Sequence, residues 1–224
     1  MSVITGIATA IVIVALAILP FLTPQWVAFE QSRSNAAGWT GFTSVELDAA
    51  TGSILSDLVF GPPAFDVQVR GQAVLDERER GHMRDVKTVF TGLWVLAATA
   101  LVVLVVASRR ADRRRTWRAV RRGAIGLAVA VVALGGVALV AFDALFEAFH
   151  EVLFPAGSYD FDPATERLVQ LFPFQFWQET AIVVGIVILA GCAVVAGVAG
   201  RRGRLTQPGD AAAAELAPAH GTSP

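Results

Sequence analysis

The sequence has one cysteine and no serine in a recognisable nucleophile motif, so it offers little with which to build a disulfide framework or a covalent catalytic centre. It contains one cysteine, Cys192, which excludes an intrachain disulfide. This cysteine lies inside an apolar run, where we expect it to pack rather than react. None of the serines, among them Ser44, Ser53 and Ser158, stands in a Gly-x-Ser-x-Gly motif. The sequence therefore offers no candidate nucleophile for an acyl-enzyme intermediate.

Charged residues are absent from four long stretches, although they make up 17% of the chain. Each stretch is close to the length of about 20 residues that a helix needs to cross a bilayer core. The first lacks a basic n-region and a small-x-small cleavage site, so we expect a retained span rather than a signal peptide. We predict an all-α membrane protein whose four transmembrane helices lie near residues 3–22, 89–107, 123–142 and 180–200.

Arginine is concentrated at one end of these spans. The loop after the second stretch holds eight arginines, and Arg201, Arg202 and Arg204 follow the fourth. Short loops rich in arginine stay in the cytoplasm. We therefore expect a multi-pass protein of the cell membrane with both termini cytoplasmic. The same arginines could instead bind anionic lipid or nucleic acid, but topology accounts for them, and we expect no nucleic-acid partner.

The predicted organisation is a membrane domain over residues 1–205 and a disordered cytoplasmic tail over 206–224, which is rich in Pro and Ala. The outer regions, 24–88 and 143–179, should form a small α/β extracytoplasmic cap. Residues 45–60 have apolar positions at helical spacing, and Gly61-Pro62-Pro63 ends that helix.

Three further patterns complete the predicted cap. Residues 65–70 alternate strictly between apolar and polar, which predicts a strand, and 72–75 can form its partner. Asp76 followed by Glu79 is a capping-box pattern, so a helix should start there and run into the second span. Residues 143–153 should extend the third span. Residues 168–177 should lie in the interface or roof a lipid-facing cavity.

Two of the three histidines, His82 and His150, stand at similar heights above predicted spans on the outer side. An imidazole is the usual general base near neutral pH, and a neighbouring carboxylate can fix its tautomer. Asp85 is the candidate partner of His82, and Glu147 or Glu151 that of His150. Two alternatives stay open here: interfacial histidines bonded to loop backbone, or a zinc site. No His-x-x-x-His or Cys-x-x-Cys spacing supports zinc, so we predict no metal and no cofactor.

Both histidines lie in motifs that resemble those of a bacterial four-span integral membrane family. The first motif is Gly81-His82-Met83-Arg84-Asp85-Val86-Lys87. The second motif comprises Phe149-His150, Phe154, Gly157, Tyr159, Phe161-Asp162-Pro163, Leu168, Leu171-Phe172-Pro173 and Phe176-Trp177. The resemblance covers about residues 1–200, and the family includes the lipoprotein intramolecular transacylase.

The resemblance implies an activity. A member of this kind moves an acyl chain from the diacylglyceryl group of a bacterial lipoprotein to the amine of its N-terminal cysteine. By resemblance, His82 and His150 are the catalytic pair, acting by acid–base catalysis without an acyl-enzyme. Membrane lipids and the diacylglyceryl lipoprotein are the expected partners. The alternative is a non-enzymatic membrane protein that binds a lipid or a partner protein.

Other residues take expected roles around this pair. Asp85, Glu147 and Asp162 are predicted to support or orient it. The residues predicted to line the substrate are Phe154, Tyr159, Phe161, Phe172, Phe176 and Trp177. The chain departs from the family pattern at Tyr159, where Trp is frequent, and at Glu166 and Glu179, where Asp is usual. These replacements keep the aromatic or acidic character of each position.

Overall fold

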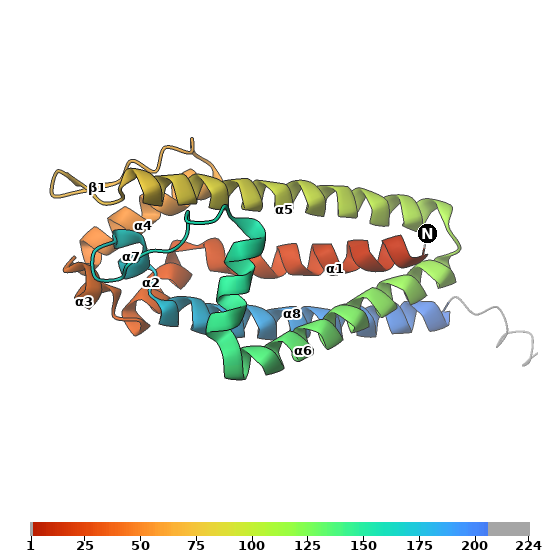
Figure 1. The fold of residues 1–224 in the computed structure, drawn as a ribbon. Coiled ribbons are helices and arrows are strands. Elements are labelled where there is room, and N and C mark those ends of the chain that lie inside the picture. The colour runs from red at the N-terminus through yellow and green to blue at the C-terminus, as the bar shows by residue number, and fades with distance from the viewer. Residues whose placement is uncertain (1, 206–224) are drawn as a thin grey trace, which may run out of the picture.

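Four long helices lie side by side in the computed structural model, which describes residues 2–205 (Figure 1). The helices are α1 (Ser2–Ile18, continued by the 3-10 helix η1, Leu19–Leu22), α5 (Glu77–Arg110), α6 (Arg113–Leu153) and α8 (Phe174–Leu205). All four are long and apolar enough to cross a membrane, so the prediction of a four-helix membrane protein is confirmed. The predicted disordered tail, 206–224, lies outside the described residues.

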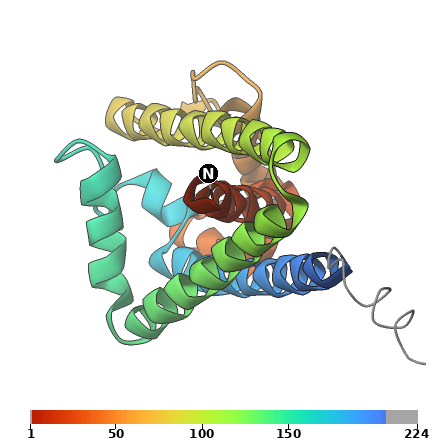
Figure 2. The ribbon, with the colours of Figure 1, turned by 90° about the vertical axis from the view of Figure 1, so that its right-hand side faces the viewer.

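Helix α1 occupies the middle of the bundle. Seen along the bundle, it lies between α5 and the α6–α8 pair (Figure 2). Its contact with α6 is made backbone to backbone: a Cβ on Gly123 would lie 2.7 Å from the Cα of Gly6. Ala119 on the same face of α6 is also buried. Small residues at this spacing let two membrane helices approach closely.

The cap lies at the end of the bundle opposite the N-terminus and the short α5–α6 turn (Figure 1). It contains four short helices and a hairpin: α2 (Pro24–Arg33), α3 (Ala36–Thr40), α4 (Ser44–Val59), α7 (Arg167–Leu171), and the antiparallel strands β1 (Gln68–Val69) and β2 (Gln72–Ala73). The predictions of α4, of the hairpin and of a small α/β cap are confirmed. Helices α2 and α3 were not predicted from the sequence.

The hairpin is much shorter than the predicted strand over 65–70. Phe65, Val67 and Val69 are buried in alternation, as the pattern predicts, but Phe65 has a φ of 49° and leaves the extended region. Arg70 and Gly71 both have positive φ, which is the geometry of a two-residue hairpin turn. Two residues of each strand pair, and one more hydrogen bond, from the Val74 N–H to the Val67 carbonyl oxygen, extends the hairpin.

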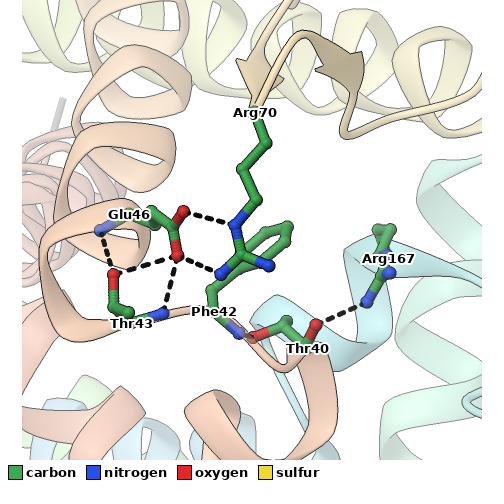
Figure 3. Close-up of polar contacts among 6 residues, drawn as sticks. All are labelled: Thr40, Phe42, Thr43, Glu46, Arg70 and Arg167. Atoms are coloured by element: carbon green, nitrogen blue, oxygen red, sulfur yellow. Dashed lines mark hydrogen bonds and ion pairs between the residues drawn. The ribbon is translucent and has the colours of Figure 1, made fainter.

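Polar contacts hold the outer end of the cap together (Figure 3). Thr43 and Glu46 form a capping box at the start of α4. The same Glu46 carboxylate accepts two hydrogen bonds from the Arg70 guanidinium of the hairpin, at 2.6 and 2.7 Å. Arg167 at the start of α7 donates to the Thr40 carbonyl oxygen and lies over the Phe42 ring. The two loop regions are thus joined in one cap.

Two charged residues fasten the cap to α5. The predicted capping box of Asp76 and Glu79 is present, and Glu79 also accepts a hydrogen bond from the backbone N–H of Leu168 at 2.6 Å. Lys87 donates to the backbone carbonyl oxygens of Asp57, Leu58 and Gly61, which closes the C-terminal end of α4. These contacts fix the cap relative to the helix segment that carries His82.

Helix α6 bends sharply at Ala141, whose φ and ψ of −149° and 48° are not helical. Residues 142–153 continue α6 but run across the long axis of the bundle (Figures 1 and 2). The predicted helical continuation of the third span over 143–153 is present, but the bend at Ala141 changes its direction. Because of the bend, the end of α6 approaches α5 and carries His150 toward His82.

Candidate functional site

The two histidine rings lie together where the cap meets the bundle. The centroids of the His82 and His150 rings are 6.0 Å apart, and the ring planes are inclined by only 22°. His82 lies two helical turns before Val89, where the predicted span begins, so it stands about 10 Å from the start of that span. Two rings from segments far apart in the sequence are thus neighbours just outside the apolar part of the helix bundle.

His82 is 6% exposed, and its Nδ1 atom is buried without a hydrogen-bond partner among the described residues. Phe154 and Phe161 lie against its ring, with centroid distances of 4.8 and 5.5 Å. Burial, followed by the nearby His150, lowers the pKa of His82 to about 4. His82 is therefore a neutral imidazole at physiological pH, and it is a poor proton acceptor.

His150 is held differently. Its Nδ1 lies 2.7 Å from the carbonyl oxygen of Phe146, one turn earlier in α6. A carbonyl only accepts hydrogen bonds, so Nδ1 carries the proton in this contact, and Nε2 of the neutral ring keeps its lone pair. The Phe146 carbonyl orients this ring, and the lone pair on Nε2 is what a proton acceptor requires.

Aromatic side chains enclose the pair. Phe154 and Tyr159 lie 5.4 and 5.2 Å from the His150 ring centroid. Burial and the nearby Glu151 and Glu147 carboxylates raise the pKa of the Tyr159 hydroxyl, so it stays protonated. On the other side of His150, the Phe146 ring contacts the rings of Phe174 and Trp177. Trp177 in turn contacts Phe172 and Phe176. Phe172 and Phe176 also pack in the core of the cap.

Two aromatic residues here were not among the predicted lining residues. Phe146 lies 4.3 Å from the His150 ring, and Phe174 contacts both Phe142 and Phe146. Phe146 could have been found, because it precedes His150 by one helical turn. Phe174 opens α8, which begins at this residue rather than at the predicted start of the span near 180.

The predicted supporting carboxylates make no hydrogen bond to the imidazole nitrogens within the described residues. Within residues 2–205, the Asp85 carboxylate makes no hydrogen bond or ion pair, and Glu147 and Glu151 are exposed and make no hydrogen bond to either imidazole. Asp162 accepts a hydrogen bond from Ala164 N–H and closes the turn before α7. The Asp162 carboxylate therefore stabilises a turn, and the Asp85 carboxylate is available to bind a ligand.

Arg78 and Glu79 hold the loop that carries Phe161 above His82. The Arg78 guanidinium donates to the Asp160 carbonyl oxygen at 2.6 Å, forms an ion pair with Glu166, and lies 4.4 Å from the Phe161 ring centroid. Burial raises the pKa of Glu79. Both residues precede His82 by about one turn of α5, so a single helix positions the ring and the loop that covers it.

The described residues contain no group of three or more His, Cys, Asp or Glu side chains placed to hold a metal ion. An open groove of about 520 Å³ adjoins His82 on the side of α5. Its walls come from α5 and from the loop after α6. The residues that line it are Arg78, Gly81, His82, Arg84, Asp85, Ala156, Gly157 and Ser158.

The fold is similar to solved structures of the membrane-integral lipoprotein intramolecular transacylase Lit from Bacillus cereus. One superimposes with a TM-score of 0.76 at 17% identity and covers 92% of this chain and 96% of the other. A variant with a histidine replaced by arginine gives a TM-score of 0.72 at 18% identity, covering 92% and 93%. No protein in a curated collection matches the sequence.

The sequence also matches the family model of the lipoprotein intramolecular transacylase Lit over residues 3–177. This match spans three of the four long helices, the cap and both histidines. The resemblance inferred from the two motifs is thereby confirmed. The chain belongs to the lipoprotein intramolecular transacylase family.

Proposed function

We propose that this protein transfers an acyl chain within a diacylglyceryl lipoprotein, from the glyceryl ester to the amine of the N-terminal cysteine. The observation that carries the proposal is the stacked pair of His82 and His150, whose centroids lie 6.0 Å apart inside an aromatic enclosure. Family membership supports the same reaction. The lipoprotein and the surrounding membrane lipids are the partners.

The reaction needs few groups from the protein. The substrate carries both the nucleophilic amine and the ester, so their proximity is supplied within one molecule. The ammonium must lose one proton to solvent, and a base must take a second from the attacking nitrogen. A donor must stabilise the oxyanion, and an acid must protonate the departing glyceryl oxygen. The C–N amide bond forms as the ester C–O bond breaks. No acyl-enzyme is required.

The environments of the two rings favour different roles. The ammonium first releases one proton to solvent. The Nε2 lone pair of His150 then takes a second proton from the nitrogen as it attacks the ester, because the Nδ1 proton is engaged by the Phe146 carbonyl. The resulting imidazolium then protonates the leaving oxygen. His82 is neutral and buried, so it donates a hydrogen bond to the oxyanion through its N–H. In this role His82 keeps its proton throughout the reaction.

The topology suits an outer-leaflet substrate. The arginine-rich α5–α6 turn and the last turn of α8 lie at the end of the bundle opposite the site, and this distribution favours a cytoplasmic location for that end and for both termini. The site then faces outside, at the height of lipid headgroups. Trp177, Tyr159 and Phe161 would contact the acyl chains, and the buried rings of Phe154, Phe172 and Phe176 would support them from behind.

The test uses fragmentation mass spectrometry, because intramolecular transfer leaves the mass of the lipopeptide unchanged. The purified protein is incubated in detergent or liposomes with a diacylated lipoprotein, whose N-terminal peptide is then sequenced. We expect N-acyl, monoacylglyceryl fragments and loss of the free amine. If folded protein leaves the amine free, the proposal fails. The rival, a lipid- or partner-binding protein, would also tolerate His82→Ala and His150→Ala in any phenotype it supports.

A further inference from the structure

The groove beside His82, called the α5 groove below, differs in chemistry from the enclosure on the other side of the histidine pair. Positions 78, 81, 82 and 85 share one face of α5 by their helical spacing. Opposite them lie Ala156, Gly157 and Ser158 of the loop after α6. Apart from His82 itself, no aromatic or large aliphatic side chain lines this groove within the described residues.

The groove walls present backbone and charge. Gly81 adds no side chain, and a Cβ built there would meet only the far end of Arg84, at 3.7 Å. Gly157, whose φ of 81° favours glycine, adds no side chain to the opposite wall. Arg84 contributes a guanidinium and Asp85 a carboxylate. Such walls suit a polar main chain, whereas the aromatic side of the pair suits hydrocarbon.

The proposed reaction requires a path for a main chain at this point. The acylated amine belongs to the first residue of a polypeptide, and two bonded carbon atoms separate it from the next amide nitrogen. The polypeptide must therefore leave the histidine pair within a few ångströms of the reacting nitrogen. It cannot follow the acyl chains, because unsatisfied peptide groups in an apolar surrounding are costly.

We propose that the α5 groove holds the first residues of the lipoprotein's polypeptide in extended form, an inference that rests on the proposed function. Asp85 accepts a hydrogen bond from a peptide N–H of the substrate. Its carboxylate is suited to this, because it has no hydrogen bond or ion pair of its own among residues 2–205. His82 borders both the α5 groove and the aromatic enclosure, so the acyl chains and the polypeptide of the substrate separate at this residue.

The test compares two substrates and a matched pair of variants. One substrate is a diacylglyceryl lipopeptide with several residues after the cysteine, and the other is diacylglyceryl-cysteine amide, which has no polypeptide. Ala156→Trp fills the groove. Ala164→Trp places the same side chain at an exposed alanine of the same loop region, outside the groove. Asp85→Asn removes the carboxylate charge without changing the size of the side chain.

We expect Ala156→Trp to lower kcat/KM for the lipopeptide at least about tenfold and to leave the cysteine amide within about twofold of wild type. Asp85→Asn should lower kcat/KM for the lipopeptide but not for the cysteine amide, and Ala164→Trp should change kcat/KM for neither substrate. Equal losses on both substrates, or no loss with Ala156→Trp, would overturn the proposal. Wild-type protein that converts neither substrate would instead show that the proposed function itself fails, and the groove's role with it.

Discussion

At the scale of single residues, two identical side chains differ because their surroundings differ. Burial against Phe154 and Phe161 holds His82 neutral, whereas one backbone carbonyl fixes the tautomer of His150. Both histidines could be selected as candidates from the sequence, because each lies in a motif and at a similar height above a predicted span. It could not predict the Phe146 carbonyl as a hydrogen-bond partner, because every residue has a carbonyl and this one is available only through the local helical geometry.

The depressed pKa of His82 predicts a pH-dependent stability. The folded-state value of about 4 lies below the ordinary value of 6.5, so the unfolded chain binds more protons between these two limits. The stabilising contribution is complete above pH 6.5 and is lost as the pH falls toward 4. We therefore expect the unfolding temperature of the wild type in detergent micelles to fall across this window.

The control for this prediction is His82→Phe, which fits the aromatic surroundings and cannot titrate. Glu79 and Glu30, whose pKa values are raised mainly by burial, are present in both proteins and cancel in the comparison. The difference in unfolding temperature between the variant and the wild type should therefore change with acidification, in favour of the variant. Parallel curves for the two proteins between pH 7 and 4 would contradict a buried, neutral His82.

At the scale of helices and strands, elements with strong local signals were predictable and the others were not. The charge-free runs, the Asp76–Glu79 capping box and the Gly-Pro-Pro end of α4 all have a local physical cause. The bend at Ala141 has no proline or glycine at its position, and Gly135 and Gly136 before it stay helical. Contacts between distant segments, such as Phe142 with Phe174, accompany the bend and cannot be inferred from nearby sequence.

The α1–α6 crossing yields a prediction about packing. A Cβ on Gly123 would overlap the backbone of Gly6, which cannot move without separating the two helices. Overpacking of this kind costs about 1–3 kcal/mol, so Gly123→Ala should lower the unfolding temperature in micelles. Gly126→Ala is the matched control three residues further along α6, because a Cβ there meets nothing within 4 Å. Equal stability of the two variants would contradict the close crossing.

At the scale of the whole molecule, the fold places one site between two kinds of surroundings. Four apolar helices lie on one side of the histidine pair, and a cap tied by Glu79, Lys87 and Arg78 lies on the other. The proposed substrate, which carries acyl chains and a polypeptide, would contact both. Fold class and family could be inferred from the sequence, whereas the meeting of His82 with His150 depends on the bent α6, which only the three-dimensional arrangement reveals.

The most direct test of the central claim, that both imidazoles act on one reacting group, is a rate comparison of three variants. The initial rate of acyl transfer on a diacylated lipopeptide is measured for His82→Ala, His150→Ala and the double variant, each with wild-type unfolding behaviour. We predict that each single variant loses about 10²–10⁴-fold and that the double variant is hardly slower than the worse single one. Near-wild-type rates for either single variant, or losses that multiply in the double variant, would contradict a shared site.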